Sequence, residues 1–195
     1  MAVTRSVLLG LLAVALTAGW AVPAAARMTV TGPFGTGLTE PVWVLHHLLG
    51  FLAVGLWAGQ NGGAAVWQVP VAALTAALAA GLASQFGVRL PYVGEGLAAS
   101  LVLMGALVAV DLRAPLALAV LVAAAAAVFH GYVQMGGALF WAGWAAGVLL
   151  VTCAGLGLAA LLGQALSARP VRMCGGAVAV AGLLDLAGRF WPLPA

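Results

Sequence analysis

Charged side chains are scarce in this chain of 195 residues: only 6% of the residues are charged, whereas 65% are hydrophobic. A soluble domain needs roughly a quarter of its residues charged to cover its surface. Lysine is absent, and the arginines form no run that could bind nucleic acid. These shortages exclude a soluble domain and a nucleic-acid-binding protein. They indicate a chain whose solvent is lipid over most of its area.

Sequence motifs of catalysis and of resident metals are also missing. The two cysteines, Cys153 and Cys174, lie far apart in apolar stretches and form no C-x-x-C pair, so they predict neither a zinc knuckle nor a redox centre. The chain contains no P-loop, no G-x-S-x-G and no H-E-x-x-H. We therefore expect no enzyme, no tightly bound cofactor and no ATP-driven pump in this chain alone.

The first 26 residues are typical of a cleavable signal peptide. Arg5 precedes an apolar stretch at residues 7–21, and Pro23 leads into three alanines that suit cleavage after Ala26. An uncleaved first span is the alternative, but the apolar stretch is short for one. Cleavage would leave residues 27–195 as a single mature domain that starts outside the cytoplasm. The Gly- and Thr-rich residues 28–39 predict an extended or loop segment.

The rest of the chain predicts a bundle of transmembrane helices. Glycine, proline and the few charges divide it into six apolar segments, at residues 42–59, 64–84, 91–110, 116–132, 138–166 and 171–188. Each segment is long enough, at about 1.5 Å per residue, to approach or cross a hydrocarbon core of about 30 Å. The fold class is therefore an all-α integral membrane protein with six transmembrane helices after the signal peptide. We expect it in a bacterial inner membrane.

Glycine pairs one helical turn apart predict close contacts between helices. Gly55 and Gly59 form one such pair, and Gly143 and Gly147 form another. In lipid, small residues let backbones approach closely and so replace the hydrophobic driving force. Packing inside the monomer is one interpretation and a seam between copies in a homo-oligomer is the other. Several of the seven tryptophans fall near predicted span ends, as in an interfacial belt.

Three stretches resemble the HupE/UreJ family of hydrogenase and urease accessory membrane proteins. They are "LLGFLAVGLWAGQ" at residues 48–60, "LPYVGEGLAASLVLMG" at 90–105 and "FHGYVQMGGAL" at 129–139. Their order and the six-span layout agree with the family over nearly all of the mature chain. The resemblance implies a nickel or cobalt permease, with Ni²⁺ or Co²⁺ as the transported ion.

The chain departs from the family pattern at several polar positions. Where the family's first span carries His-Pro and then Asp-His, this chain has Glu40-Pro41 and His46-His47. Where the family has F-H-G-H followed by another histidine, only the first histidine, His130, is present; Tyr132 and Gln134 follow it. A divergent branch of the family is therefore expected.

Ionisable residues within membrane spans are costly and mark candidate functional sites. We expect His47, His130 and Glu95, from three different spans, to lie at one membrane level and to contact a passing metal ion. Imidazole nitrogens with some carboxylate suit nickel and cobalt. Glu40 and His46 could complete the ligand set, although His46 points about 100° away from His47 on a helix.

Structural roles are the alternatives for these residues. His47 and His130 could simply be hydrogen-bonded within the bundle, and Glu95 could bond Ser100 or Tyr92. The second functional hypothesis follows from the missing ligands: a non-transporting membrane scaffold, or a subunit that binds another membrane protein. Asp185 and Arg189, four residues apart, predict a neutralising ion pair.

Overall fold

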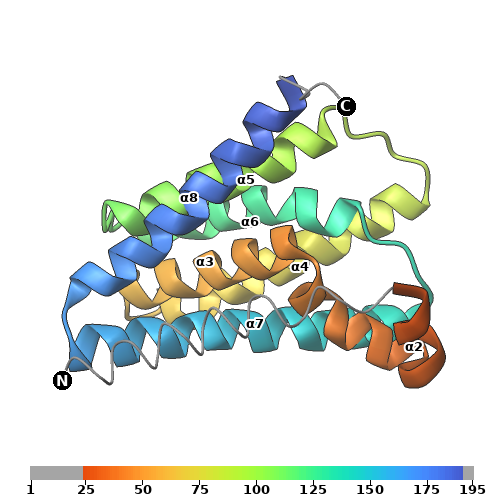
Figure 1. Cartoon of the computed structure of the whole chain (residues 1–195), viewed down its shortest axis with the longest axis horizontal. Coiled ribbons are helices and arrows are strands. Elements are labelled where there is room, and N and C mark those ends of the chain that lie inside the picture. The colour runs from red at the N-terminus through yellow and green to blue at the C-terminus, as the bar shows by residue number, and fades with distance from the viewer. Residues whose placement is uncertain (1–23, 191–195) are drawn as a thin grey trace.

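The structure, a computed structural model, describes residues 24–190, and within that range it is helical without any strand. Figure 1 shows the helices running roughly side by side, with short connections. Most of the predicted signal peptide, residues 1–23, lies outside the described residues. The helices are α2 (Ala24–Trp43), α3 (Leu45–Asn61), α4 (Ala65–Gln85), α5 (Val93–Ala109), α6 (Leu116–Tyr132), α7 (Ala138–Ala165) and α8 (Ala168–Phe190).

Each of the six predicted spans corresponds to one helix, from α3 to α8, and the observed ends fall within three residues of the predicted ones. The prediction of a loop at residues 28–39 was wrong, because α2 covers that segment. The segment contains Gly32, whose φ of 62° interrupts the helical backbone, and two prolines, Pro33 and Pro41. Packing against α7 outweighs this poor helix propensity.

Three of the described helices, α4, α7 and α8, are long and apolar enough to cross a membrane. The second part of α2, from Gly32, and α3 pass the same test together, but they meet at a bend of 74°. Helices α5 and α6 are apolar and have 17 residues each, a length of about 25 Å at 1.5 Å per residue. The architecture is thus all-α and suited to a membrane.

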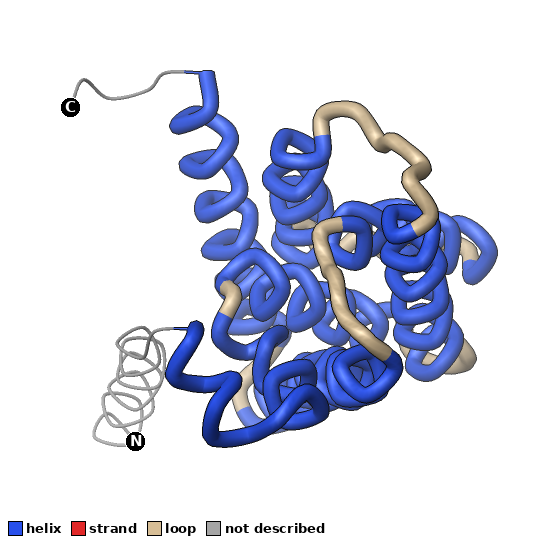
Figure 2. The backbone as a smooth tube through the Cα atoms, turned by 90° about the vertical axis from the view of Figure 1, so that its right-hand side faces the viewer, coloured by secondary structure: helices blue, strands red, loops and turns tan. Residues whose placement is uncertain are grey.

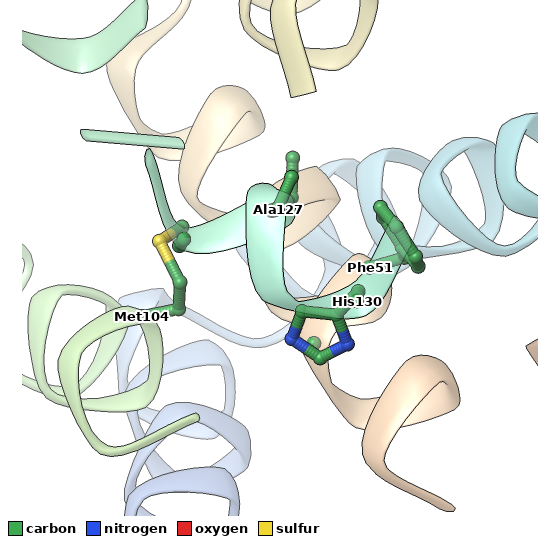
Figure 3. A pocket seen from close by; sticks show the side chains of 7 residues that line it. Phe51, Met104, Ala127 and His130 are labelled. Carbon is green, nitrogen blue, oxygen red and sulfur yellow. The ribbon is translucent and has the colours of Figure 1, made fainter. Parts of the chain in front are cut away.

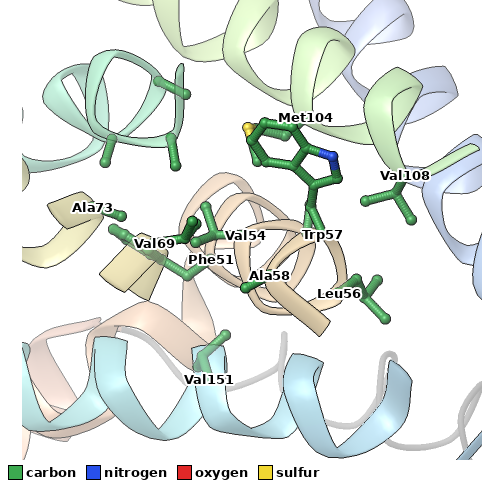
Figure 4. Close-up of a cluster of buried hydrophobic side chains, with 14 of the residues drawn as sticks. Phe51, Val54, Leu56, Trp57, Ala58, Val69, Ala73, Met104, Val108 and Val151 are labelled. Carbon is green, nitrogen blue, oxygen red and sulfur yellow. The ribbon is translucent and has the colours of Figure 1, made fainter. Parts of the chain in front are cut away.

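Helix α3 lies at the centre of the bundle and contacts every other described helix. Its residues from Phe51 to Ala58 are buried on all sides except at Leu52, which is half-buried. A helix that is hydrophobic all round belongs in the interior. Figure 2 views most helices end-on, and Figure 4 shows apolar side chains of α3 together with those that pack around it. Trp57, on α3, donates its indole N–H to the carbonyl oxygen of Leu112 at 2.7 Å.

The backbones of α3 and α7 approach closely at glycines. A Cβ atom on Gly55 would collide with the backbone of Thr152, and one on Gly155 would collide with that of Leu52. Gly143 and Gly147 likewise face the backbone of α2, at Phe34 and Leu38. The predicted close contacts at both glycine pairs are therefore confirmed, and they lie within the monomer.

This packing predicts that Gly155→Leu destabilises the protein and that Gly157→Leu does not. Added atoms at Gly155 must push α3 away, which costs about 1–3 kcal/mol for an overpacked site. Gly157 is exposed on the same helix, and its Cβ would meet open space. Thermal unfolding in a mild detergent measures the difference. A Gly155→Leu protein that unfolds at the same temperature as Gly157→Leu would contradict the contact.

Candidate functional site

The carboxylate of Glu40 is the hub of a hydrogen-bonded network at one end of the bundle. Its Oε1 accepts a bond from Gln134 Nε2 at 3.0 Å and lies 2.8 Å from His47 Nδ1. Its Oε2 accepts a bond from Trp144 Nε1 at 2.8 Å. The side chains of Glu40 and His47 are 16% and 3% exposed. An apolar bundle can hold a carboxylate this deeply only when donors surround it.

Four separate segments supply this network. Glu40 lies in the last turn of α2, and His47 lies in the first turn of α3. Gln134 lies in the loop after α6, and Trp144 belongs to α7. The helical conformation is interrupted at Val44, whose backbone is extended. Helices α2 and α3 meet there at a bend of 74°. Residues seven positions apart therefore face each other across the bend.

The carboxylate determines which nitrogen of His47 carries the proton. A carboxylate accepts but does not donate, so Nδ1 holds the hydrogen and Nε2 keeps a lone pair. Gln134 Nε2 lies 3.3 Å from that second nitrogen. A carboxylate behind one imidazole nitrogen is the arrangement that orients histidines whose other nitrogen binds metal. His47 is therefore preorganised as a donor of one lone pair.

His130, from the last turn of α6, lies beside His47, with 5.4 Å between the ring centroids. Its Nε2 is 2.9 Å from the hydroxyl of Ser100, and that hydroxyl donates to the carbonyl oxygen of Leu97 at 2.7 Å. Because the hydroxyl has one hydrogen, Nε2 must donate to it. The lone pair of His130 is thus on Nδ1, which is buried and has no partner among the described residues.

Small and apolar residues hold the His130 ring in place. A Cβ atom on Gly50 would lie 2.5 Å from His130 Cε1, so only glycine leaves room for the imidazole at that position. Phe51, Met104 and Ala127 line the narrow crevice beside the ring, as Figure 3 shows. The other residues that line the crevice are apolar, so none of their side chains offers a hydrogen-bond donor.

The other two predicted ligands lie apart from this network. His46 bonds Asp185 at 3.1 Å, and Asp185 also accepts a bond from Arg189 at 3.1 Å. The predicted ion pair between Asp185 and Arg189 is confirmed, as is the divergence of the two adjacent histidines. Glu95 is half-buried in the first turn of α5, and its side chain forms no hydrogen bond or ion pair with any described residue.

The structure brings Glu40, His47 and His130 together and leaves the metal-binding part of the prediction open. Between residues 24 and 190, no three histidine, cysteine or acidic side chains are arranged to hold a metal ion. The sequence did not identify Trp144 as part of the site. Trp144 is fully buried, and so is Trp57, so these two tryptophans are not part of the predicted interfacial belt.

Tyr132 occupies the position at which the family resemblance implies a second histidine. Its hydroxyl donates to the carbonyl oxygen of Val88 at 2.8 Å and accepts a bond from the N–H of Leu90 at 3.0 Å. The tyrosine thereby ties the loop between α4 and α5 to the end of α6. Gln134, at the position of the third histidine, is the residue that joins Glu40 and His47.

Comparisons with known proteins agree with the sequence resemblance. The family model described as "HupE / UreJ protein" matches residues 8–184. Protein HupE from Rhizobium leguminosarum bv. viciae is 36% identical over 159 residues, which cover 78% of this chain and 83% of the relative. No solved structure matches the chain.

Two neighbouring tryptophans provide a test of the network. Trp144→Phe leaves one oxygen of the Glu40 carboxylate without its donor, whereas Trp141→Phe removes an indole N–H that has no partner among the described residues. We expect Trp144→Phe to lower the free energy of unfolding by about 1–3 kcal/mol more than Trp141→Phe. Chemical denaturation in detergent measures both. Equal losses would show that the Trp144 bond contributes nothing.

Proposed function

Since the chain belongs to the HupE/UreJ family, we propose that it is a membrane permease for Ni²⁺ or Co²⁺. The transported ion is cargo and not a resident cofactor. Entry takes place at the end of the bundle that holds Glu40, His47 and His130. The six helices α3–α8 cross the inner membrane of a bacterium, and the cytoplasmic ion serves the maturation of a nickel enzyme.

The observation that carries this proposal is the pair of neighbouring imidazoles, whose ring centroids lie 5.4 Å apart. His47 keeps a lone pair on Nε2, and His130 keeps one on Nδ1. Each ring is oriented by a partner on its other nitrogen. Buried ionisable groups are expensive in a membrane span, and a chain with four acidic and seven basic residues has placed a carboxylate and two histidines together.

The chemistry of the donors suits the proposed ion. Imidazole and carboxylate bind borderline divalent metals such as nickel and cobalt, and imidazole discriminates against Mg²⁺ and Ca²⁺, which prefer oxygen ligands alone. Glu40 already accepts bonds from Gln134 and Trp144. An arriving ion would exchange the Gln134 amide for metal coordination. A site that must release its ion needs such an open and exchangeable set.

Glu95 and His46 remain auxiliary candidates in this proposal. Glu95 has an unengaged carboxylate in the first turn of α5, five residues before Ser100, the partner of His130. It could attract the ion before His47 and His130 bind it. His46 Nε2 is hydrogen-bonded to Asp185, so its contribution requires that this bond open.

The two adjacent histidines offer a matched test of transport. His47→Gln removes an imidazole from the network around Glu40. His46→Gln makes the same change at the adjacent residue, whose imidazole bonds Asp185 instead. We expect nickel uptake by cells that carry His47→Gln to fall by about tenfold or more, as for lost metal-site groups, while His46→Gln stays near the wild type. Uptake is measured with radioactive nickel at matched membrane expression. Equal uptake in wild type, both variants and an empty-vector strain would refute the permease.

A second function, a non-transporting scaffold, is favoured by one specific feature. Every polar atom of Glu40 is already engaged within the chain, as a purely structural network would require. In that case affinity purification in mild detergent recovers a stoichiometric membrane partner, and uptake does not depend on His47. Recovery of a lone, monodisperse protein would count against the scaffold.

A further inference from the structure

The hydroxyl of Ser100, in the first half of α5, is the fixed point behind the His130 ring. Both residues are deeply buried, with 4% of the surface of Ser100 and 3% of that of His130 exposed. The hydroxyl oxygen lies 2.9 Å from His130 Nε2, whereas Nδ1 has no partner among the described residues. The serine is therefore the one group that can decide how this imidazole is presented to an ion.

The single hydrogen of the hydroxyl is directed back along the helix. It is donated to the carbonyl oxygen of Leu97 at 2.7 Å, and that oxygen keeps its place because it belongs to the backbone of α5. In the reverse arrangement the hydroxyl would donate to His130 Nε2 and the ring proton would move to Nδ1. That arrangement loses the bond to Leu97 and buries an N–H group without an acceptor, which is costly.

Glycines on α5 hold the hydroxyl at its place against α6. Gly96 lies one turn before Ser100, and a Cβ atom there would collide with the ring of Phe129, the neighbour of His130 in sequence. Farther along the helix, a Cβ atom on Gly105 would collide with the backbone of α8. Helix α5 is thus packed closely on two sides, and the face with Gly96 and Ser100 fits the end of α6 that carries His130.

The spacing of the two rings in the site lets one ion reach both. Two imidazoles that bind one ion at about 2.1 Å place their ring centres up to roughly 6 Å apart. The centroids of His47 and His130 are 5.4 Å apart. Each ring must then turn a nitrogen without a proton toward the ion, because only a lone pair can coordinate. The carboxylate of Glu40 secures this for His47, and the hydroxyl of Ser100 secures it for His130.

We propose that Ser100 is a positioning residue of the metal site: by accepting a hydrogen bond from Nε2, it fixes His130 as a donor through Nδ1. The ion then meets His130 through Nδ1 and His47 through Nε2, so the two rings use different nitrogens. Ser100 itself does not touch the ion. That the ion is transported Ni²⁺ or Co²⁺ rests on the proposed function, whereas the place of the proton on His130 does not.

Nuclear magnetic resonance of the full-length chain in detergent, labelled with ¹⁵N only in histidine, reads the proton's place directly. The chain has three histidines, so three imidazole patterns are expected, and each is assigned by its loss on substitution with glutamine. Couplings from the ring C–H protons to the two nitrogens show which nitrogen is protonated. We expect Nε2 for His130 in the wild type. In Ser100→Ala the proton should be shared between both nitrogens, because Nε2–H has lost its acceptor, and Ser100→Thr should restore the wild-type pattern.

Nickel binding to the same purified proteins, titrated with NiCl₂ by calorimetry, measures what this orientation contributes. Removing the partner that orients a metal-binding histidine lowers affinity by about 10- to 100-fold. We expect Ser100→Ala to raise the Kd for nickel by at least about tenfold, and Ser100→Thr to bind nearly as the wild type does. Both measurements are independent of transport, so they decide the role of Ser100 even if nickel uptake by cells does not depend on His47.

Thr152→Val is the matched control for the loss of a buried hydroxyl. Thr152 is 2% exposed, and its hydroxyl donates to the carbonyl oxygen of Val148 at 2.8 Å, as that of Ser100 does to Leu97, but it contacts no histidine. This variant should leave the His130 pattern and the Kd for nickel unchanged, even if it lowers the unfolding temperature. A wild-type proton on Nδ1 of His130, an unchanged pattern in Ser100→Ala, no saturable nickel binding, or an equal Kd in wild type and Ser100→Ala would each overturn the proposal.

Discussion

The contact between the backbones of α3 and α7 at Gly55 and Gly155 is the constraint on which the site depends. Gly143 and Gly147, on either side of Trp144, likewise bring α7 against α2, so that Trp144 reaches the carboxylate of Glu40 that faces His47 on α3. The same central helix places Gly50 against His130. In lipid, where apolar surface alone does not drive association, such close packing is what holds helices in register. The polar network is thus a product of glycine spacing.

The helices were predictable because a membrane leaves few alternatives. Long apolar segments must be helical to satisfy their backbones, and Gly, Pro and charged residues mark where they end. Helix α2 was not predictable on those grounds. Pro33, Pro41 and Gly32 all have low helix propensity. The helix forms because its backbone at Phe34 and Leu38 packs against the glycines of α7. That contact joins residues about a hundred positions apart in the sequence, so helix propensity, which depends on local sequence, does not predict it.

Part of the candidate site was likewise predictable from the sequence, and part was not. The divergence of His46 from His47 follows from helical geometry and was predicted. Glu40 meets His47 across the bend at Val44, which helical spacing does not describe. Gln134 and Trp144 complete the carboxylate's partners from a loop and from a distant helix, so their roles depend on tertiary packing. The role of Trp144 was not predictable from its neighbours in sequence, because a tryptophan near the end of a span has the same local sequence whether it faces lipid or a buried acceptor.

Tyr132 has a mechanical consequence for this end of the bundle. A single phenolic oxygen both donates to Val88 and accepts from Leu90, whereas a neutral imidazole has its donor and acceptor on different atoms and could not bridge the two groups in this way. A histidine at this position would leave either the Val88 carbonyl or the Leu90 N–H without its bond. The tyrosine therefore fixes the loop between α4 and α5 to the end of α6 through one atom, next to the segment that carries His130 and Gln134.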